Sequence, residues 1–113
     1  MKANRRKTLC VLPTTGDKKI EVEVVYSTGG YSYYDYKNHP RGYWLHVRPI
    51  EFTDSGFVTF VFGDGRKFFV SEANRFGAKA FDRAVEKARG MVDDAVEKIC
   101  HMNGLTLAPV GDE

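Results

Sequence analysis

The chain has 113 residues and a formal net charge of +2, with 42% hydrophobic and 28% charged residues. These values are ordinary for one globular domain and exclude a chain that is disordered throughout. No apolar run reaches the length of a membrane span, and no apolar segment of the signal-peptide type follows the charged N-terminus. The sequence therefore predicts a cytoplasmic protein with no membrane partner.

The positive excess lies at the N-terminal end, in Lys2, Arg5, Arg6 and Lys7, while Asp112 and Glu113 close the chain. Without these six residues, basic and acidic side chains are equal in number. A nucleic-acid-binding domain usually carries a basic face on its folded body, so this distribution does not favour one. We expect a disordered basic leader over residues 1–7, a single domain over 8–105 and a loose C-terminal tail over 106–113.

Two stretches alternate between apolar and polar residues with a period of two, which is typical of half-buried strands. In the first, one face carries Ile20, Val22, Val24 and Tyr26 and the other carries Glu21, Glu23 and Ser27. In the second, Tyr43, Leu45 and Val47 oppose Trp44, His46 and Arg48. Proline has no backbone donor, so Pro49 predicts a sheet edge or a bulge at the far end of this strand.

Shorter strands are expected at residues 8–12, 31–36, 57–62 and 66–70, and the polar segment 37–42 is expected to be a loop. The short, turn-rich connections favour antiparallel neighbours. From Ser71 to Met102 the apolar residues instead follow helical spacing. Ser71 is the expected N-cap, Asn103-Gly104-Leu105 fits a left-handed C-cap, and Gly90 allows a kink or a break. The predicted fold is α+β, an antiparallel meander of four to five strands followed by one long, possibly kinked, C-terminal helix packed on one face.

Aromatic residues concentrate in one part of the sequence, because all six tyrosines and the single tryptophan lie between residues 26 and 44. A tyrosine ring combines a large apolar surface with a polar tip, which enriches tyrosine at interfaces. The alternative is that these residues cover the solvent face of a sheet and bind nothing. We take as candidate binding residues Tyr31, Tyr33, Tyr34, Tyr36, Arg41, Tyr43, Trp44, His46 and Arg48.

No catalytic or metal-binding pattern occurs. The three histidines and two cysteines lack ligand spacing, and no nucleophile motif is present. Cys10 and Cys100 each stand among apolar residues and are expected to be buried free thiols. The sequence predicts a non-enzymatic protein without a metal or cofactor.

Residues 29 to 90 resemble a pattern found in short uncharacterised proteins of bacterial phages and mobile elements. The resemblance rests on Gly29-Gly30-Tyr31, Tyr33-Tyr34 and the segment from Arg41-Gly42-Tyr43-Trp44-Leu45 to Pro49-Ile50-Glu51. It implies strands followed by a helix and a mobile-element origin, and it implies no activity. This chain differs by adding residues 8–27 as a hairpin.

Two binding functions follow from these features. The preferred one is a protein–protein contact through a Tyr/Trp-rich sheet surface, in an accessory factor of a mobile element. Self-association through an exposed edge strand is also open. The alternative is a single-stranded nucleic-acid binder, in which aromatic rings stack on bases and basic residues contact phosphates.

Overall fold

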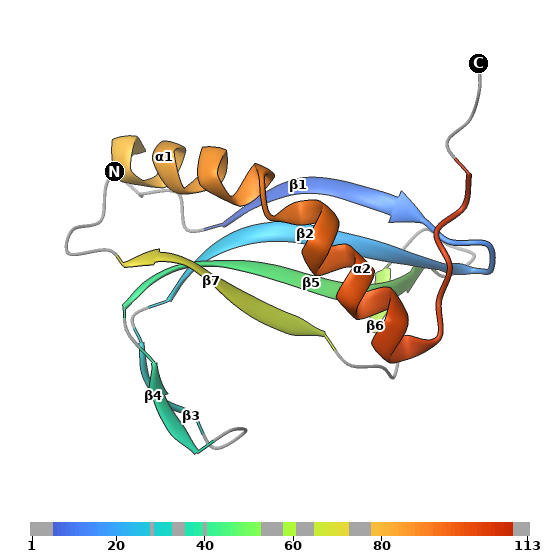
Figure 1. The fold of residues 1–113 in the computed structure, drawn as a ribbon, viewed down its shortest axis with the longest axis horizontal. Coiled ribbons are helices and arrows are strands. Elements are labelled where there is room, and N and C mark those ends of the chain that lie inside the picture. Colours follow the sequence, from blue (N-terminus) through green and yellow to red (C-terminus); the bar gives the residue numbers. More distant parts are fainter. Residues whose placement is uncertain are drawn as a thin grey trace.

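The computed structural model describes residues 6–27, 29–32, 36–39, 41–52, 58–60, 65–72 and 78–109. An antiparallel sheet carries two helices on one of its faces (Figure 1), which confirms the α+β class. The strands are β1 (Arg6–Pro13), β2 (Lys18–Ser27), β3 (Gly30–Ser32), β4 (Lys37–His39), β5 (Gly42–Phe52), β6 (Val58–Phe60) and β7 (Arg66–Glu72). The helices are α1 (Ala78–Arg89) and α2 (Val92–Asn103).

The long strand β5 organises the main sheet. Along one edge it pairs with β2, which in turn pairs with β1. Along its other edge β5 pairs first with β7, up to Val47, and then with β6, from Ile50 onward. Pro49 falls between these two stretches on one side of β5, but on the other side it pairs with Ile20 of β2 without a register shift. The prediction of a sheet edge or a bulge at Pro49 is therefore wrong, because β5 lies inside the sheet.

A second, two-stranded sheet interrupts the connection between β2 and β5. There β3 pairs with β4, and Tyr36 occupies the turn between them with φ of 56°. Gly29 and Gly30, with φ of 85° and 118°, let the chain leave β2 in a direction that other residues rarely adopt. The prediction of one strand over 31–36 and a loop over 37–42 is therefore wrong, because the reversal occurs before Lys37 and not after it.

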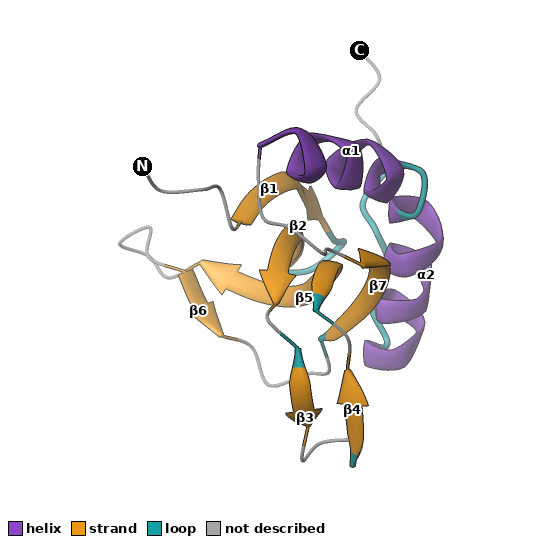
Figure 2. Cartoon of the chain, turned by 90° about the vertical axis from the view of Figure 1, so that its left-hand side faces the viewer, coloured by secondary structure: helices purple, strands orange, loops and turns teal. Residues whose placement is uncertain are grey.

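The helical part differs from the single long helix that the periodicity predicted. Ser71 and Glu72 belong to β7 and do not begin a helix. The helix is interrupted at Gly90 and Met91, where the Met91 amide donates a hydrogen bond to Ala88 O at 2.8 Å. From there α2 runs at an angle to α1 (Figures 1 and 2). The predicted C-cap is confirmed, since Gly104 has φ of 65° and the Leu105 amide donates to Cys100 O at 2.8 Å.

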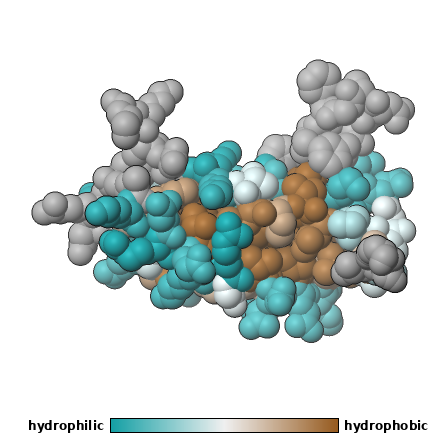
Figure 3. Space-filling model, turned by 90° about the horizontal axis from the view of Figure 1, so that it is seen from above, coloured by the Kyte–Doolittle hydropathy of each residue, from teal (hydrophilic) through white to brown (hydrophobic). Residues whose placement is uncertain are grey.

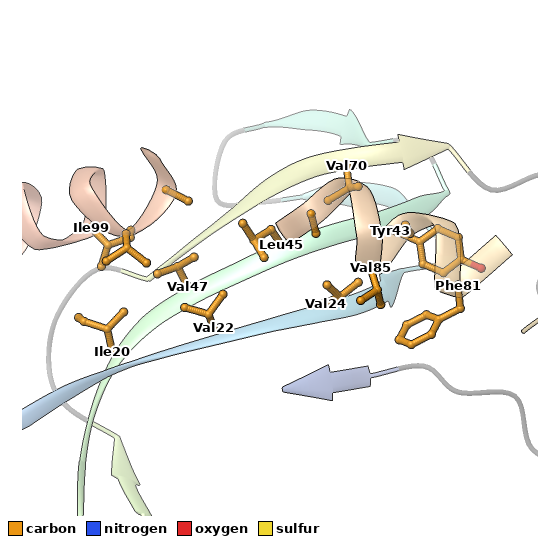
Figure 4. Close-up of a cluster of buried hydrophobic side chains, with 14 of the residues drawn as sticks. Ile20, Val22, Val24, Tyr43, Leu45, Val47, Val70, Phe81, Val85 and Ile99 are labelled. Atoms are coloured by element: carbon orange, nitrogen blue, oxygen red, sulfur yellow. The ribbon is translucent and has the colours of Figure 1, made fainter. Parts of the chain in front are cut away.

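The core lies between the sheet and the helices, as Figure 4 shows. Alternate residues of the strands meet the apolar stripes of α1 and α2 there, and the cluster includes Ile20, Val22, Val24, Tyr43, Leu45, Val47, Val70, Phe81, Val85 and Ile99. The predicted facing of Tyr43, Leu45 and Val47 is confirmed. Cys100 is buried, Cys10 is half-buried, and both are free thiols.

The described residues near both ends of the chain form backbone contacts that the sequence did not predict. Arg6 and Lys7 form part of β1, while residues 1–5 lie outside the described part. The Ala108 amide donates to Pro13 O at 3.0 Å, and Thr106 O accepts from the Thr15 amide at 2.9 Å. Residues 106–108, which were expected to belong to a loose tail, thus pair with the backbone of residues 13–15. Neither of the described helices is long and apolar enough to cross a membrane.

Candidate functional site

The sheet face turned away from the helices carries a row of polar side chains. Thr8, Glu23, His46 and Lys67 are successive cross-strand partners on β1, β2, β5 and β7. Paired residues point to the same face of a sheet, so these four side chains are neighbours. We call this face the outer face.

Glu23 is the centre of this row and is only 3% exposed. A carboxylate buried this deeply needs partners of opposite charge. Arg6 Nε lies 3.1 Å from Glu23 Oε1, and Arg48 Nη2 lies 4.0 Å from Glu23 Oε2. Two guanidinium groups therefore neutralise Glu23 from two different strands.

Arg48 also joins Glu21 to the network. Its Nε donates a hydrogen bond to Glu21 Oε1 at 2.7 Å, and its Nη2 lies 2.7 Å from the same oxygen. Charge-assisted contacts of this length are the stronger kind of hydrogen bond. Glu21, Glu23, His46, Arg48 and Arg6 form what we call the outer-face network.

His46 is neutral near pH 7. Burial lowers its pKa to about 4, with further lowering by Arg48, Lys67 and Arg6, while Glu21 acts in the opposite direction. His46 Nδ1 lies 3.7 Å from Glu23 Oε2, which is too long for a hydrogen bond. Because the ring is neutral, this contact is not an ion pair at neutral pH.

The order of the groups in this row does not match a catalytic triad. In a triad the histidine stands between the nucleophile and the acid. Here Glu23 stands between Thr8 and His46. Burial raises the pKa of both cysteine thiols, Cys10 and Cys100, which keeps them protonated at neutral pH. Among the described residues, no three His, Cys, Asp or Glu side chains lie close enough to hold a metal ion.

The predicted aromatic surface is divided between three places. Tyr43 is 1% exposed and packs between Tyr26 and Phe81, with ring centroids at 5.5 and 5.8 Å. Its prediction as a surface residue is wrong, because it shares the helix-covered face with Leu45. Trp44 points to the outer face but is 8% exposed and packs edge-on against Phe69 at 5.0 Å.

Of the predicted aromatic site residues that the structure describes, the exposed ones lie in the β3–β4 hairpin. Tyr31 is 49% exposed and Tyr36 is 73% exposed. Figure 2 shows the hairpin projecting from the main sheet, on the side away from α1. Arg41, at the base of the hairpin, is also exposed. Tyr33 and Tyr34 lie outside the described residues.

Apart from Tyr43 and Trp44, which are buried, the described residues of the predicted site fall into two parts, and the structure adds residues to one of them. His46 and Arg48 join Glu21, Glu23 and Arg6 in the outer-face network, whereas Tyr31, Tyr36 and Arg41 belong to the hairpin. The two glutamates were not among the predicted site residues. A usable signal was present, since Glu21 and Glu23 alternate with buried residues on one strand, as His46 and Arg48 do on another.

No protein-family model matches the chain, and neither the curated proteins nor the solved structures give a significant match.

Proposed function

We propose that the protein is a non-enzymatic binding module that contacts a protein partner through the β3–β4 hairpin. The observation that carries the proposal is the exposure of Tyr31 and Tyr36 on a projecting two-stranded element. Within the described residues, β3 and β4 pair only with each other. An isolated two-stranded hairpin is marginally stable in water, so a partner that covers it would add stability to it.

The chemistry of the hairpin also suits a protein interface. Its exposed side chains combine tyrosine with basic and amide groups, namely Tyr31, Tyr36, Lys37, Asn38 and Arg41. Tyrosine and arginine are enriched in the residues that dominate binding energy. This composition favours a partner surface that offers carboxylates around an apolar patch. The site is narrower than the sheet surface expected from the sequence, because Tyr43 and Trp44 are buried.

We further propose, from the resemblance to phage and mobile-element proteins, that the module is a mobile-element accessory factor acting in the cytoplasm. Single-stranded nucleic-acid binding is the second candidate. The same two tyrosines could stack on bases while Lys37 and Arg41 contact phosphates. Trp44 does not support this candidate, because its ring is packed against Phe69.

The test compares a Tyr31→Ala/Tyr36→Ala double variant with wild type in capture from a host lysate. The matched control is Leu107→Ala, an exposed apolar residue at the opposite end of the main sheet. We expect wild type and the control to retain one partner and the double variant to lose it. Hydrogen exchange on the purified complex should then show protection of residues 30–32 and 37–39.

A labelled single-stranded oligonucleotide, titrated at low and moderate salt, separates the two candidates. Saturable binding that weakens steeply with salt and is lost in the double variant would replace the protein-partner proposal with the nucleic-acid one. Retention of the captured protein by the double variant would remove the hairpin as the contact.

A further inference from the structure

The strand β1 forms one edge of the main sheet, opposite to the edge formed by β6 and β7. Within the described residues it pairs with β2 on one side, and only its end, from Pro13, pairs with residues 106–108 on the other. The outer backbone groups of residues 6–12 therefore offer a template for another strand. A bulge between Thr8 and Cys10, together with Lys7 and Pro13, keeps this template short.

The apolar core is incomplete along this edge. Leu9, Cys10 and Leu12 pack against the core cluster but are only partly buried. Beside them, β1 and α2 border an open groove with a volume of about 590 Å³, whose apolar lining includes Leu12 and Val96. Figure 3, which views the molecule from above, shows a continuous hydrophobic area on this side. A strand added to β1 would cover these side chains.

Charged side chains near the two ends of this edge have opposite signs, so this edge of one copy is complementary to the same edge of another. Lys7 is paired with Val24, so its side chain lies on the helix-covered face of the sheet. Asp93 and Glu97 of α2 line the groove next to Leu12, toward the other end of β1. In an antiparallel pairing of two β1 strands, Lys7 of each strand comes to the Leu12 end of the other. Each lysine would then lie beside the carboxylates of the opposite copy.

We propose that the β1 edge binds a second copy of this chain, through antiparallel pairing of residues 7–12 with the same residues of the copy. The contact is self-complementary, as a two-fold interface requires, and it joins the two main sheets into one. It ends at Leu12, because residues 106–108 occupy the edge beyond it. This surface is distinct from the hairpin of the proposed function and goes beyond it.

The test measures the monomer–dimer equilibrium of the full chain by sedimentation, from low to high micromolar protein. We expect a dimer whose dissociation constant rises about tenfold or more in Lys7→Glu and in Asp93→Lys, because each change acts twice in a symmetric contact. The Lys7→Glu/Asp93→Lys variant, which exchanges the two charges, should restore most of the affinity. Circular dichroism checks that each variant is folded.

Tyr36→Lys is the matched control, since it adds a charge at an exposed site on the hairpin and should leave the dimer unchanged. A chain that stays monomeric at all concentrations overturns the proposal. A dimer that responds equally to Tyr36→Lys, or that the charge exchange fails to restore, also overturns it. A monomeric chain, or a charge exchange that restores nothing, does not affect capture of a partner by Tyr31 and Tyr36, so the two proposals fail separately.

Discussion

The two faces of the main sheet use the same strands in different ways. On the helix-covered face, β2 and β5 contribute aliphatic residues such as Val22, Leu45 and Val47, all at 0% exposure. On the outer face, the same two strands contribute the outer-face network apart from Arg6 of β1, with only a few apolar residues such as Trp44. Neighbouring residues in one strand therefore lie in a dry core and in an ion network.

This difference shows how stability and specificity are divided in the sheet. Packing on the helix-covered face needs only apolar volume, which many residues can provide. The outer face needs particular charged partners, because Glu23 without them would be a buried, uncompensated charge. Substitutions on the helix-covered face should change the free energy of unfolding by the same amount at every pH. Substitutions on the outer face should change how the free energy of unfolding depends on pH.

The largest effect is expected in the core. Leu45→Ala removes a fully buried side chain and should lower the free energy of unfolding by about 2–5 kcal/mol. Val11→Ala, an exposed apolar residue on β1, should change it by less than about 0.5 kcal/mol. Urea titration of both variants measures the difference. Equal losses in the two variants would contradict the assignment of the core to the helix-covered face.

The next effect concerns pH. The pKa of His46 is lowered from 6.5 to about 4 in the folded state, so between these values the unfolded chain binds a proton that the folded chain does not. Stability should therefore fall as the pH drops from about 6.5 to 4, and it is fully present above this window. The expected loss is about 2 kcal/mol, because water still screens part of the ring.

His46→Gln should remove this part of the pH dependence, since glutamine does not titrate. Urea titrations of wild type and variant across the window measure it, and the other two histidines contribute equally to both proteins. If the stability of the two proteins changed with pH in parallel, the pKa of His46 would not be lowered in the folded state.

Arg48→Met tests the outer-face network directly. It removes the hydrogen bond and the ion pair to Glu21 and one of the guanidinium groups near Glu23, and we expect a loss of about 1–3 kcal/mol. Lys67→Met, at an exposed site on the same face, is the control and should cost less than about 0.5 kcal/mol. Thermal unfolding at neutral pH compares the two. A stable Arg48→Met protein would mean that the network contributes nothing to folding.

The smallest effects are expected at two glycines in the helical layer. Gly104 has φ of 65°, so Gly104→Ala should destabilise the protein by about 1 kcal/mol. Gly90 has no positive φ, and an added Cβ would only meet Lys87 O at 3.6 Å. Gly90→Ala should therefore stabilise the protein by about 0.4–1 kcal/mol. Melting temperatures that shift in the same direction would contradict these different backbone roles.

Much of the fold could be predicted because local patterns are sufficient for it. The alternation of β2 and β5 and the cap at Gly104 each depend on residues close in sequence. The helix start was wrong because Ser71 and Glu72 satisfy a capping pattern locally, yet their backbone pairs with β5. The sequence allowed a kink or a break at Gly90 and did not distinguish the two, because the apolar stripe continues through it.

The candidate site was less predictable for a different reason. The cluster of tyrosines is visible in the sequence, but proximity along the chain does not fix which side of the sheet each ring occupies. Tyr43 and Trp44 are adjacent in sequence and lie on opposite faces. The network around Glu23 forms only when three strands come into register.

The sequence by itself determined the α+β class, the alternation of the two central strands and the left-handed end of the last helix, because these depend on periodicity and on local backbone preference. Only the tertiary structure decided which strand face the helices cover, which tyrosines stay exposed and which charges meet on the outer face. Those outcomes depend on strand register, and register is fixed by contacts between residues that are far apart in the chain.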